Sequence, residues 1–281
     1  MEIFKEIALL KAYVRAAKRQ QKSIGLVPTM GALHSGHISL AEASKKQNDI
    51  TICSIFVNPT QFNNPTDLVK YPRTLDKDTL LLEKVECDAI FCPEITEMYP
   101  QQSSIKFDFG QLDKVMEGQF RPGHFSGVAL IVSKLFNVVE PDHAYFGQKD
   151  WQQFAVISKL VEELKFSLTL HSVATTRETD GLAMSSRNLR LTEAQRAKAI
   201  VFYQALIRAK EALKSGADVG TMKKLVREIV EQDPEVRLEY VELADRVNLN
   251  LLERVNFADQ SILCIAGFVG EIRLIDNMFL D

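Results

Sequence analysis

The sequence predicts an α/β protein, namely a Rossmann-like parallel sheet with helices on both faces, followed by a smaller α+β part. From Ile24 to about Val173, short apolar runs rich in β-branched residues alternate with segments of helical period. After Arg187, long helical segments come first and strand-like runs follow. At 281 residues the chain exceeds the usual domain size of about 100–200 residues. We therefore expect two unequal domains, 1–174 and 175–281.

The first part contains five predicted strands and four predicted helices in alternation. The strands are the apolar runs at 24–27, 50–57, 89–92, 143–146 and 167–173. The helices are the periodic segments at 37–46, 76–84, 125–138 and 151–164, and residues 1–21 read as a further amphipathic helix. In this architecture ligands bind beyond the carboxyl ends of the strands.

The second part opens with a helix whose two ends are marked in the sequence. Thr192 and Gln195 have the spacing of a capping box, and Gly216 follows the last periodic residue. A second helix is predicted near 219–232, before Pro234. Strands are predicted at 236–243, 261–269 and 271–276, the last two joined by a hairpin at Gly270.

Composition and charge argue against several classes of protein. The net charge is −3 and no long run of like charges occurs, so a nucleic-acid partner is not expected. No apolar segment approaches the roughly 18 residues of a membrane span, and we expect neither an export signal nor an anchor. The four cysteines form no CxxC pair, and three lie in or beside apolar runs as buried thiols would, which fits a cytoplasmic protein.

The stretch VPTMGALHSGH, residues 27–37, carries two of the five histidines on a turn between a strand and a helix. Backbone N–H groups and the positive end of a helix meet at such a turn, which suits a phosphate. His34 and His37 could donate further hydrogen bonds to phosphoryl oxygens. Two alternatives remain open: the pair could bind zinc, or it could only cap the helix. The GxxxxGK[ST] and GxGxxG patterns are absent, which disfavours kinase-like and dinucleotide-binding proteins.

Three further motifs place polar side chains at predicted strand ends or in loops. SIFVNPTQF puts Asn58 and Gln61 after a strand, where their amides suit a small polar molecule. AYFGQKDWQQ puts Lys149 at a helix start, where the helix dipole disfavours a cation unless an anion binds there. TTRETDGLAMSSRNLRL offers two hydroxyls and the Arg187 guanidinium within one loop, a combination that matches phosphate oxygens.

HSGH resembles the HIGH motif of the nucleotidyltransferase superfamily, and the full string from Val27 resembles one family within it, the pantothenate synthetases (pantoate–β-alanine ligases). The loop that carries Ser185, Ser186 and Arg187, called here the serine loop, looks like this family's form of the superfamily KMSKS loop. It departs from KMSKS in having Ala183 and Arg187 at the two lysine positions, which argues against an aminoacyl-tRNA synthetase. The resemblance extends over essentially the whole chain and is densest from Val27 to Asn188.

The resemblance implies which residues form the site. Those expected to be catalytic are His34, His37, Lys149, Ser185, Ser186 and Arg187. Those expected to bind ATP also include Met30, Gly31, Ala32, Leu33, Ser35, Gly36, Gly147, Gln148, Asp150, Thr176 and Met184. Those expected to bind pantoate or β-alanine are Pro28, Thr29, Asn58, Gln61, Tyr71, Arg121, His124 and Gln153. Family members often have acidic residues after YPRT that help to hold Mg²⁺, which here are Asp76 and Asp78, with Lys77 between them.

The resemblance also implies the reaction. Pantoate would attack ATP to give pantoyl adenylate and pyrophosphate, and β-alanine would then displace AMP to give pantothenate, a precursor of coenzyme A. Mg²⁺ is the expected metal, and a homodimer is expected from the family alone. Because an acyl adenylate hydrolyses readily, the part after Ala174 is the expected lid. The alternatives are another HIGH-motif adenylyltransferase that acts on a small carboxylate or phosphate substrate, and a nucleotide-binding sensor without catalysis.

Overall fold

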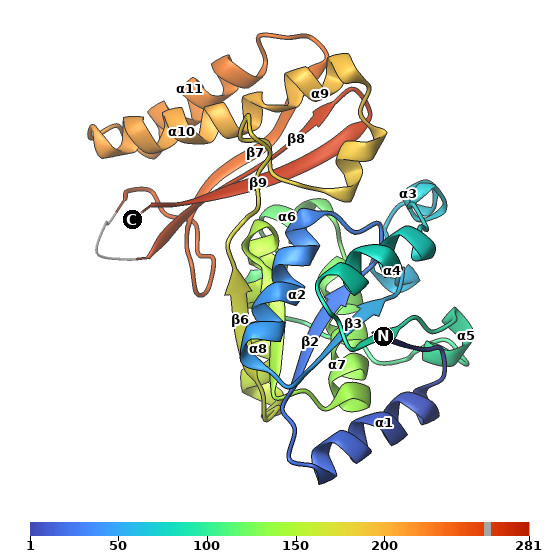
Figure 1. Cartoon of the computed structure of the whole chain (residues 1–281). Coiled ribbons are helices and arrows are strands. Elements are labelled where there is room, and N and C mark those ends of the chain that lie inside the picture. Colours follow the sequence, from blue (N-terminus) through green and yellow to red (C-terminus); the bar gives the residue numbers. More distant parts are fainter. Residues whose placement is uncertain (256–259, 281) are drawn as a thin grey trace.

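The computed structural model describes residues 1–255 and 260–280 and contains two sheets (Figure 1). In the larger sheet the strand order is β1-β4-β3-β2-β5-β6, and every pair is parallel. Its strands are β1 (Glu2–Phe4), β2 (Ile24–Thr29), β3 (Ile50–Ile55), β4 (Ala89–Phe91), β5 (His143–Gly147) and β6 (Thr169–Val173). The predicted parallel sheet is therefore confirmed.

Helices cover both faces of this sheet. The helices of the larger part are α1 (Ile7–Arg19), α2 (Ser35–Gln47), α3 (Pro65–Lys70), α4 (Leu75–Lys84), α5 (Ile95–Met98), α6 (Met116–Phe120), α7 (His124–Val139) and α8 (Trp151–Leu164). Successive strand residues point to opposite faces: Leu26 packs in the cluster with α1, α7 and α8, whereas Val27 packs in the cluster with α2 and α4. Burial on both faces explains why these strands are apolar throughout.

The larger sheet reverses its direction of winding between β2 and β5. From β2 the chain proceeds through β3 to β4 on one side, while β5 and β6 lie on the other side. At such a switch point the loops that follow the two strands diverge and leave a crevice at the carboxyl ends. The histidine turn follows β2 and the Lys149 turn follows β5, so both border this crevice.

The smaller part is an antiparallel sheet, in the order β7-β8-β9, with three helices on one face (Figure 1). Its elements are α9 (Glu193–Ala199), α10 (Val201–Lys214), α11 (Val219–Val230), β7 (Val236–Asp245), β8 (Ser261–Val269) and β9 (Ile272–Leu280). The predicted capping box at Thr192 and the hairpin at Gly270, whose φ is 56°, are both present. The single predicted helix is interrupted at Ile200, although its backbone stays in the helical region there.

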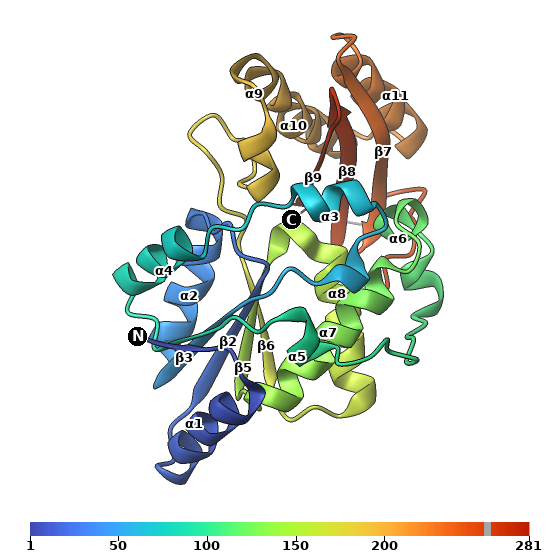
Figure 2. The same cartoon turned by 90° about the vertical axis from the view of Figure 1, so that its right-hand side faces the viewer.

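The other face of the small sheet packs on the larger part through a shared apolar cluster. Phe125 of α7 and Val156 of α8 contribute from the larger part, and Ile262 and Ala266 of β8 contribute from the small sheet. Figure 2 shows α6 and α8 beside β7 and β8. Buried apolar contact between the parts stabilises one relative placement of the two sheets.

The predicted bounds differ from the structure at the N-terminus, on β3 and on β9, where the strand predicted at 271–276 runs from Ile272 to Leu280. The short helices α3, α5 and α6 were not predicted. The predicted N-terminal helix begins only at Ile7, because residues 2–4 form the edge strand β1 beside β4. The predicted strand 50–57 ends at Ile55, and the two residues after it lead into the Asn58 turn.

Among the described helices, none combines the length and the apolar character needed to cross a membrane.

Candidate active site

Two adjoining cavities lie at the carboxyl ends of β2 and β5. The first, called here the histidine cavity, has a volume of about 170 Å³ and is lined by His34 and His37. The second, called here the amide cavity, has a volume of about 160 Å³ and is lined by Asn58 and Gln61. Seven residues line both: Pro28, Met30, His37, Tyr71, Phe146, Asp150 and Gln153. The two cavities are therefore halves of one cleft.

Most of the residues expected from sequence line this cleft. The histidine cavity collects Met30, His34, Gly36, His37, Gly147, Lys149, Asp150, Thr176, Met184, Ser185, Ser186 and Arg187. The amide cavity collects Pro28, Thr29, Asn58, Gln61, Tyr71 and Gln153. Gly31, Ala32, Leu33, Ser35 and Gln148 belong to the turns behind these walls rather than to the linings.

The turn after β2 has an unusual backbone that a buried carboxylate holds in place. Gly31 and Ala32 have φ angles of 78° and 50°, in the left-handed region that costs a residue with a side chain free energy. Asp78 of α4, only 1% exposed, accepts hydrogen bonds from the N–H groups of Ala32 (3.0 Å) and Leu33 (2.8 Å). It also accepts one from the Thr74 hydroxyl at 3.1 Å. Asp78 thus stabilises the strained turn.

This role differs from the metal binding expected for Asp76 and Asp78. Both Asp78 oxygens are used by the turn, and Asp76 is exposed on the first turn of α4. Within residues 1–255 and 260–280, no group of three or more histidine, cysteine, aspartate or glutamate side chains is placed to hold a metal ion. The sequence predicted two carboxylates near the site. It could not show that backbone N–H groups of the turn donate hydrogen bonds to both oxygens of one of them, Asp78.

His34 caps α2, and both His34 and His37 line the histidine cavity. His34 is the N-cap of α2, and its Nδ1 accepts a hydrogen bond from the Gly36 N–H at 3.2 Å. The His37 Nδ1 accepts a longer one from the His34 N–H at 3.4 Å. Since each Nδ1 accepts, each neutral ring carries its proton on Nε2. The two ring centroids lie 4.1 Å apart.

Both imidazoles are held in the neutral form. Burial first, and then the positive charge of Lys149, lowers the pKa of His34 to about 4. Burial, followed by His34 and Lys149, lowers the pKa of His37 to about 3. At neutral pH the rings are therefore hydrogen-bond donors without charge, suited to oxygens on which negative charge develops.

Lys149 and Arg187 are the cations that line the histidine cavity in the part of the chain that the structure describes. Lys149 lies in a short 3-10 turn, Gln148–Asp150, that precedes α8, and its Nζ is 3.5 Å from the Asp150 carboxylate. The lysine side chain is only 15% exposed. Asn277 of β9 donates hydrogen bonds to the carbonyls of Gln148 and Lys149, each at 2.8 Å. The small sheet thus fixes the backbone that carries the lysine, a contact that the sequence analysis did not predict.

The serine loop closes the cavity from the side of the small sheet. The Ser185 hydroxyl caps a short 3-10 helix by accepting from the Arg187 N–H at 3.2 Å. Ser186 and Tyr71 share a hydrogen bond between hydroxyls at 3.1 Å. Met184 is held by its N–H, which donates to the Thr176 carbonyl at 3.0 Å. The serine loop and Tyr71 are therefore in contact, and both line the histidine cavity.

The amide cavity has a polar end and an apolar wall. Asn58 donates to the Gln61 side-chain oxygen and to the Gly127 carbonyl, both at 3.1 Å, and accepts from the Tyr99 hydroxyl at 2.8 Å. This leaves the Gln61 amide nitrogen, which lies 3.0 Å from the Met30 sulfur, facing the cavity. The apolar wall, missed from sequence, consists of Phe56, Val128, Ile131, Val132, Leu135 and Phe146. The α7 residues among them looked like ordinary core positions of an amphipathic helix.

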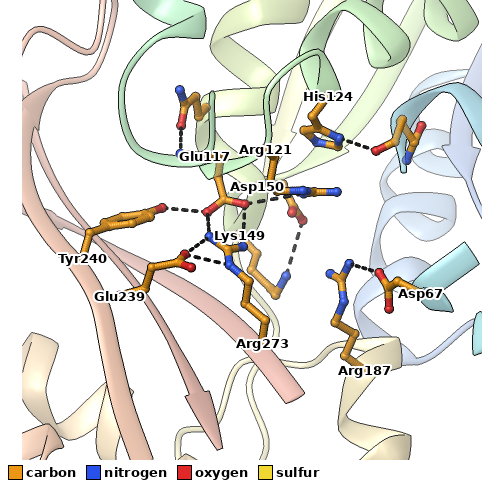
Figure 3. A network of polar contacts seen from close by, with 12 residues as sticks. Asp67, Glu117, Arg121, His124, Lys149, Asp150, Arg187, Glu239, Tyr240 and Arg273 are labelled. Carbon is orange, nitrogen blue, oxygen red and sulfur yellow. Dashed lines mark hydrogen bonds and ion pairs between the residues drawn. The ribbon is translucent and has the colours of Figure 1, made fainter. Parts of the chain in front are cut away.

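Arg121 and His124 line a separate small cavity of about 30 Å³ beside Lys149, Asp150 and Gln153. The His124 Nδ1 bonds to the Gln61 carbonyl at 2.9 Å (Figure 3). Because a carbonyl can only accept, this nitrogen carries the proton. Burial first, and then Arg121, lowers the pKa of His124 to about 3. The structure thus places both residues next to the cleft and not in it.

A buried ionic network joins α6 to the small sheet near this point (Figure 3). Arg273 of β9 forms two hydrogen bonds with Glu117, at 2.7 and 2.8 Å, and also bonds to Glu239 of β7. The Tyr240 hydroxyl donates to Glu117 at 2.9 Å. Burial alone would raise the pKa of Glu117, but Arg273 outweighs it and holds this pKa at about 2. The network therefore stays charged across the ordinary pH range.

Comparisons with known proteins agree over nearly the full length. The family model for pantoate-beta-alanine ligase matches residues 2–279. A pantothenate synthetase from Bacteroides thetaiotaomicron is 47% identical over 281 residues, which cover 99% of this chain and 98% of the relative. One from Moorella thermoacetica is 45% identical over 282 residues, with coverage of 100% and 99%.

Two solved structures are similar to the whole chain. Pantothenate synthetase from Thermus thermophilus has a TM-score of 0.92 at 38% identity, over 99% of each chain. A pantoate-beta-alanine ligase from Francisella tularensis, solved in complex with beta-gamma ATP and beta-alanine, has a TM-score of 0.84 at 33% identity. That likeness covers 100% of this chain and 98% of the other.

Proposed function

The chain belongs to the pantoate-beta-alanine ligase family, and we propose that the paired cavities carry out its two half-reactions. The enzyme condenses pantoate with β-alanine at the expense of ATP, and pantoyl adenylate is the intermediate. One observation carries the assignment of residues. Neutral imidazoles, a lysine and a serine–arginine loop line one half of the cleft, and amides opposite an apolar wall line the other half.

ATP is proposed to bind in the histidine cavity. The pantoate carboxylate attacks the α-phosphorus, the bond to the bridging oxygen breaks, and pyrophosphate leaves with both electrons of that bond. Lys149 and Arg187 offset the charge on the leaving phosphates, and Ser185 and Ser186 donate hydrogen bonds to them. The Nε2–H groups of His34 and His37 stabilise charge that increases in the transition state. No covalent bond to the enzyme is needed.

Pantoate is proposed to bind in the amide cavity. It has a hydroxyl at one end, a carboxylate with an adjacent hydroxyl at the other end, and a dimethyl carbon between them. The amides of Asn58, Gln61 and Gln153 suit the polar groups, and the wall of α7 suits the methyl groups. Asp150 and Gln153 line both cavities, so the carboxylate would lie between the two halves, within reach of the α-phosphate.

β-Alanine is proposed to enter from the side of Arg121 and His124. Its neutral amine attacks the acyl carbon, AMP leaves, and the amine loses a proton as the amide forms. The guanidinium of Arg121 is the group of this cavity best suited to the amino-acid carboxylate. A cavity of about 30 Å³ holds about one water molecule, so side chains must move when the amine enters.

Mg²⁺ is proposed to accompany ATP. The cleft offers the Asp150 carboxylate as a hard oxygen ligand, whereas Asp78 is already engaged by the backbone. One protein carboxylate with phosphate oxygens and waters is a common environment for Mg²⁺. The ion would supply positive charge next to the phosphates, and the residues named above do the rest of the positioning.

The remaining features of the assembly are proposals that rest on the family and on the fold. We propose that residues 1–174 bind ATP and pantoate and that residues 175–281 cover the cleft. The shared apolar cluster and the Glu117 network favour a cover that is largely fixed in place, with its serine loop as the moving element. A cytoplasmic homodimer is proposed by likeness to the family.

The experiment that tests this function is pyrophosphate–ATP exchange with Mg²⁺ and pantoate but without β-alanine. β-Alanine is then added, and AMP and pantothenate are measured. Exchange that depends on pantoate, followed by equal amounts of AMP and amide, is expected. Exchange without amide would indicate an adenylyltransferase that keeps its adenylate. Absence of any turnover would contradict an enzymatic role and favour a nucleotide-binding sensor.

A further inference from the structure

Asp67 does not line the cleft, but it accepts a hydrogen bond from Arg187, which does. Asp67 lies on α3, and one of its oxygens accepts a hydrogen bond from Arg187 at 3.1 Å (Figure 3). Its other oxygen accepts one from Arg190 at 2.6 Å. Each of the three side chains is about a quarter exposed, at 23–25%. The Tyr71–Ser186 hydrogen bond at 3.1 Å makes a second tie between the same two segments. The segment 62–71 is thus attached to the serine loop chiefly through Asp67.

Arg187 stands between two cavities. It lines the histidine cavity and also a side cavity of about 410 Å³ between α3 and the small sheet. The side cavity carries five cations and three carboxylates: Lys70, Arg121, Arg187, Arg190 and Arg273, with Asp67, Glu239 and Glu271. Such an excess of positive charge attracts anions.

Arg190 shares Asp67 with Arg187, whereas the other two arginines of the side cavity have partners of their own. Arg121 lies 3.5 Å from Glu117, and Arg273 bonds to Glu117 and Glu239. Asp67 is therefore the carboxylate that engages Arg187. Burial alone would raise the pKa of Asp67, but the charges and hydrogen bonds of the two arginines outweigh it and lower this pKa. Asp67 is consequently charged, and it competes with any phosphate that approaches Arg187.

We propose that Asp67 is a positioning residue that competes with pyrophosphate for Arg187, holding the guanidinium before ATP binds and reclaiming it as pyrophosphate leaves toward the side cavity. This inference rests on the proposed function. When a group is paired in the free state, the apparent affinity of a ligand that needs that group is reduced by the pairing. Weaker binding of pyrophosphate speeds the release of this first product. It also limits the reverse reaction, in which bound pyrophosphate attacks the adenylate and re-forms ATP.

The test measures pyrophosphate as an inhibitor of pantothenate formation in the wild type and in Asp67→Asn. Removal of the competing charge should strengthen inhibition about fivefold, the factor that corresponds to a partly exposed ion pair. Turnover should fall as release slows, whereas the KM for ATP should fall or stay constant. Asp67→Glu keeps the charge and should lie near the wild type. Partial loss of the folded protein would lower the apparent kcat but would leave the KM values and the inhibition constant unchanged.

A second variant has the opposite expected sign. Arg190→Gln leaves Asp67 with Arg187 alone and removes a cation from the side cavity, so inhibition by pyrophosphate should weaken. If Asp67→Asn does not fold, Arg190→Gln decides alone, and unchanged or stronger inhibition in it overturns the proposal. Glu231→Gln breaks a surface pair with Arg227 on α11, at 2.9 Å, and is the control expected to match the wild type.

The failures of the two proposals are distinguishable. Wild-type protein that makes no pantothenate would overturn the proposed function. An active wild type with an Asp67→Asn inhibition constant within twofold of it, or weaker, would overturn the role of Asp67 alone.

Discussion

The side chain of Asn277 donates one hydrogen bond to the Gln148 carbonyl and one to the Lys149 carbonyl, each at 2.8 Å. Asn277 lies on β9, far along the sequence from the turn that it contacts. Asn277 is only 6% exposed. The backbone of Lys149 is therefore fixed by the small sheet. The same contact couples the position of that sheet to the geometry of the cleft.

This contact predicts that Asn277→Ala lowers kcat/KM for ATP by about tenfold, because a displaced lysine stabilises the leaving phosphates less well. The loss of two buried hydrogen bonds should also lower the free energy of unfolding by about 2 kcal/mol. Steady-state kinetics and thermal unfolding measure both. Asn137→Ala is the control, since Asn137 is exposed and bonds only within α7. Equal ATP kinetics in the two variants would contradict the positioning role.

His34 caps α2, and the proposed function gives it a second role in catalysis, so two substitutions should separate these roles. His34→Ala removes the cap and the Nε2–H donor, whereas His34→Asn keeps an oxygen that can accept from the Gly36 N–H. Both should slow pantoate-dependent exchange by about 10²-fold or more, the effect of losing one donor to a transition-state oxyanion. Only His34→Ala should also lose about 1 kcal/mol of stability. Exchange at the wild-type rate in His34→Asn would show that the ring is merely a cap.

Sequence patterns predicted the longer helices and strands and most of the residues that line the cleft, because these depend on local periodicity and on the ends of strands. They could not predict contacts between distant segments. Asn277 with Lys149, Arg273 with Glu117, and Asp78 with the N–H groups of the β2 turn each join residues far apart in the chain. The three-residue strand β1 was missed because it is too short to show an alternation and is followed directly by α1.

The hydrogen bonds of Asp78 predict that its substitution lowers the stability of the fold and leaves the Mg²⁺ dependence of the activity unchanged. In Asp78→Asn one amide oxygen must serve two buried N–H groups, so stability should fall by about 1–3 kcal/mol. For a chain of this size, that corresponds to a decrease in Tm of roughly 2–4 °C for each kcal/mol. The Mg²⁺ concentration that gives half-maximal activity should remain that of the wild type. A shift of that concentration by about tenfold would restore the metal role expected from sequence.

The low pKa of His124 predicts how stability depends on pH. Its pKa is about 3 in the folded protein and near 6.5 in an unfolded chain. Between these values the unfolded state binds more protons, so stability falls as the pH decreases from about 6.5 toward 3. His124→Asn removes the titrating group and keeps a donor for the Gln61 carbonyl. Its Tm should decrease less than that of the wild type between pH 6.5 and pH 4.5, and an equal decrease would mean that His124 contributes nothing to this dependence.

Close packing at Gly127 predicts a selective effect on pantoate. A Cβ on Gly127 would lie 2.2 Å from the Thr60 carbonyl oxygen and 2.8 Å from the Gln61 nitrogen, so the turn that carries Asn58 and Gln61 must move. Gly127→Ala should therefore raise the KM for pantoate at least about tenfold and leave the KM for ATP nearly unchanged, since a displacement of about 1 Å disrupts positioned groups. Gly220→Ala is the matched control, because its Cβ would meet only the exposed side chain of Asp218, at 3.1 Å. If both KM values rose together in Gly127→Ala, the two halves of the cleft would not be separate binding sites, and the assignment of pantoate to the amide cavity would be wrong.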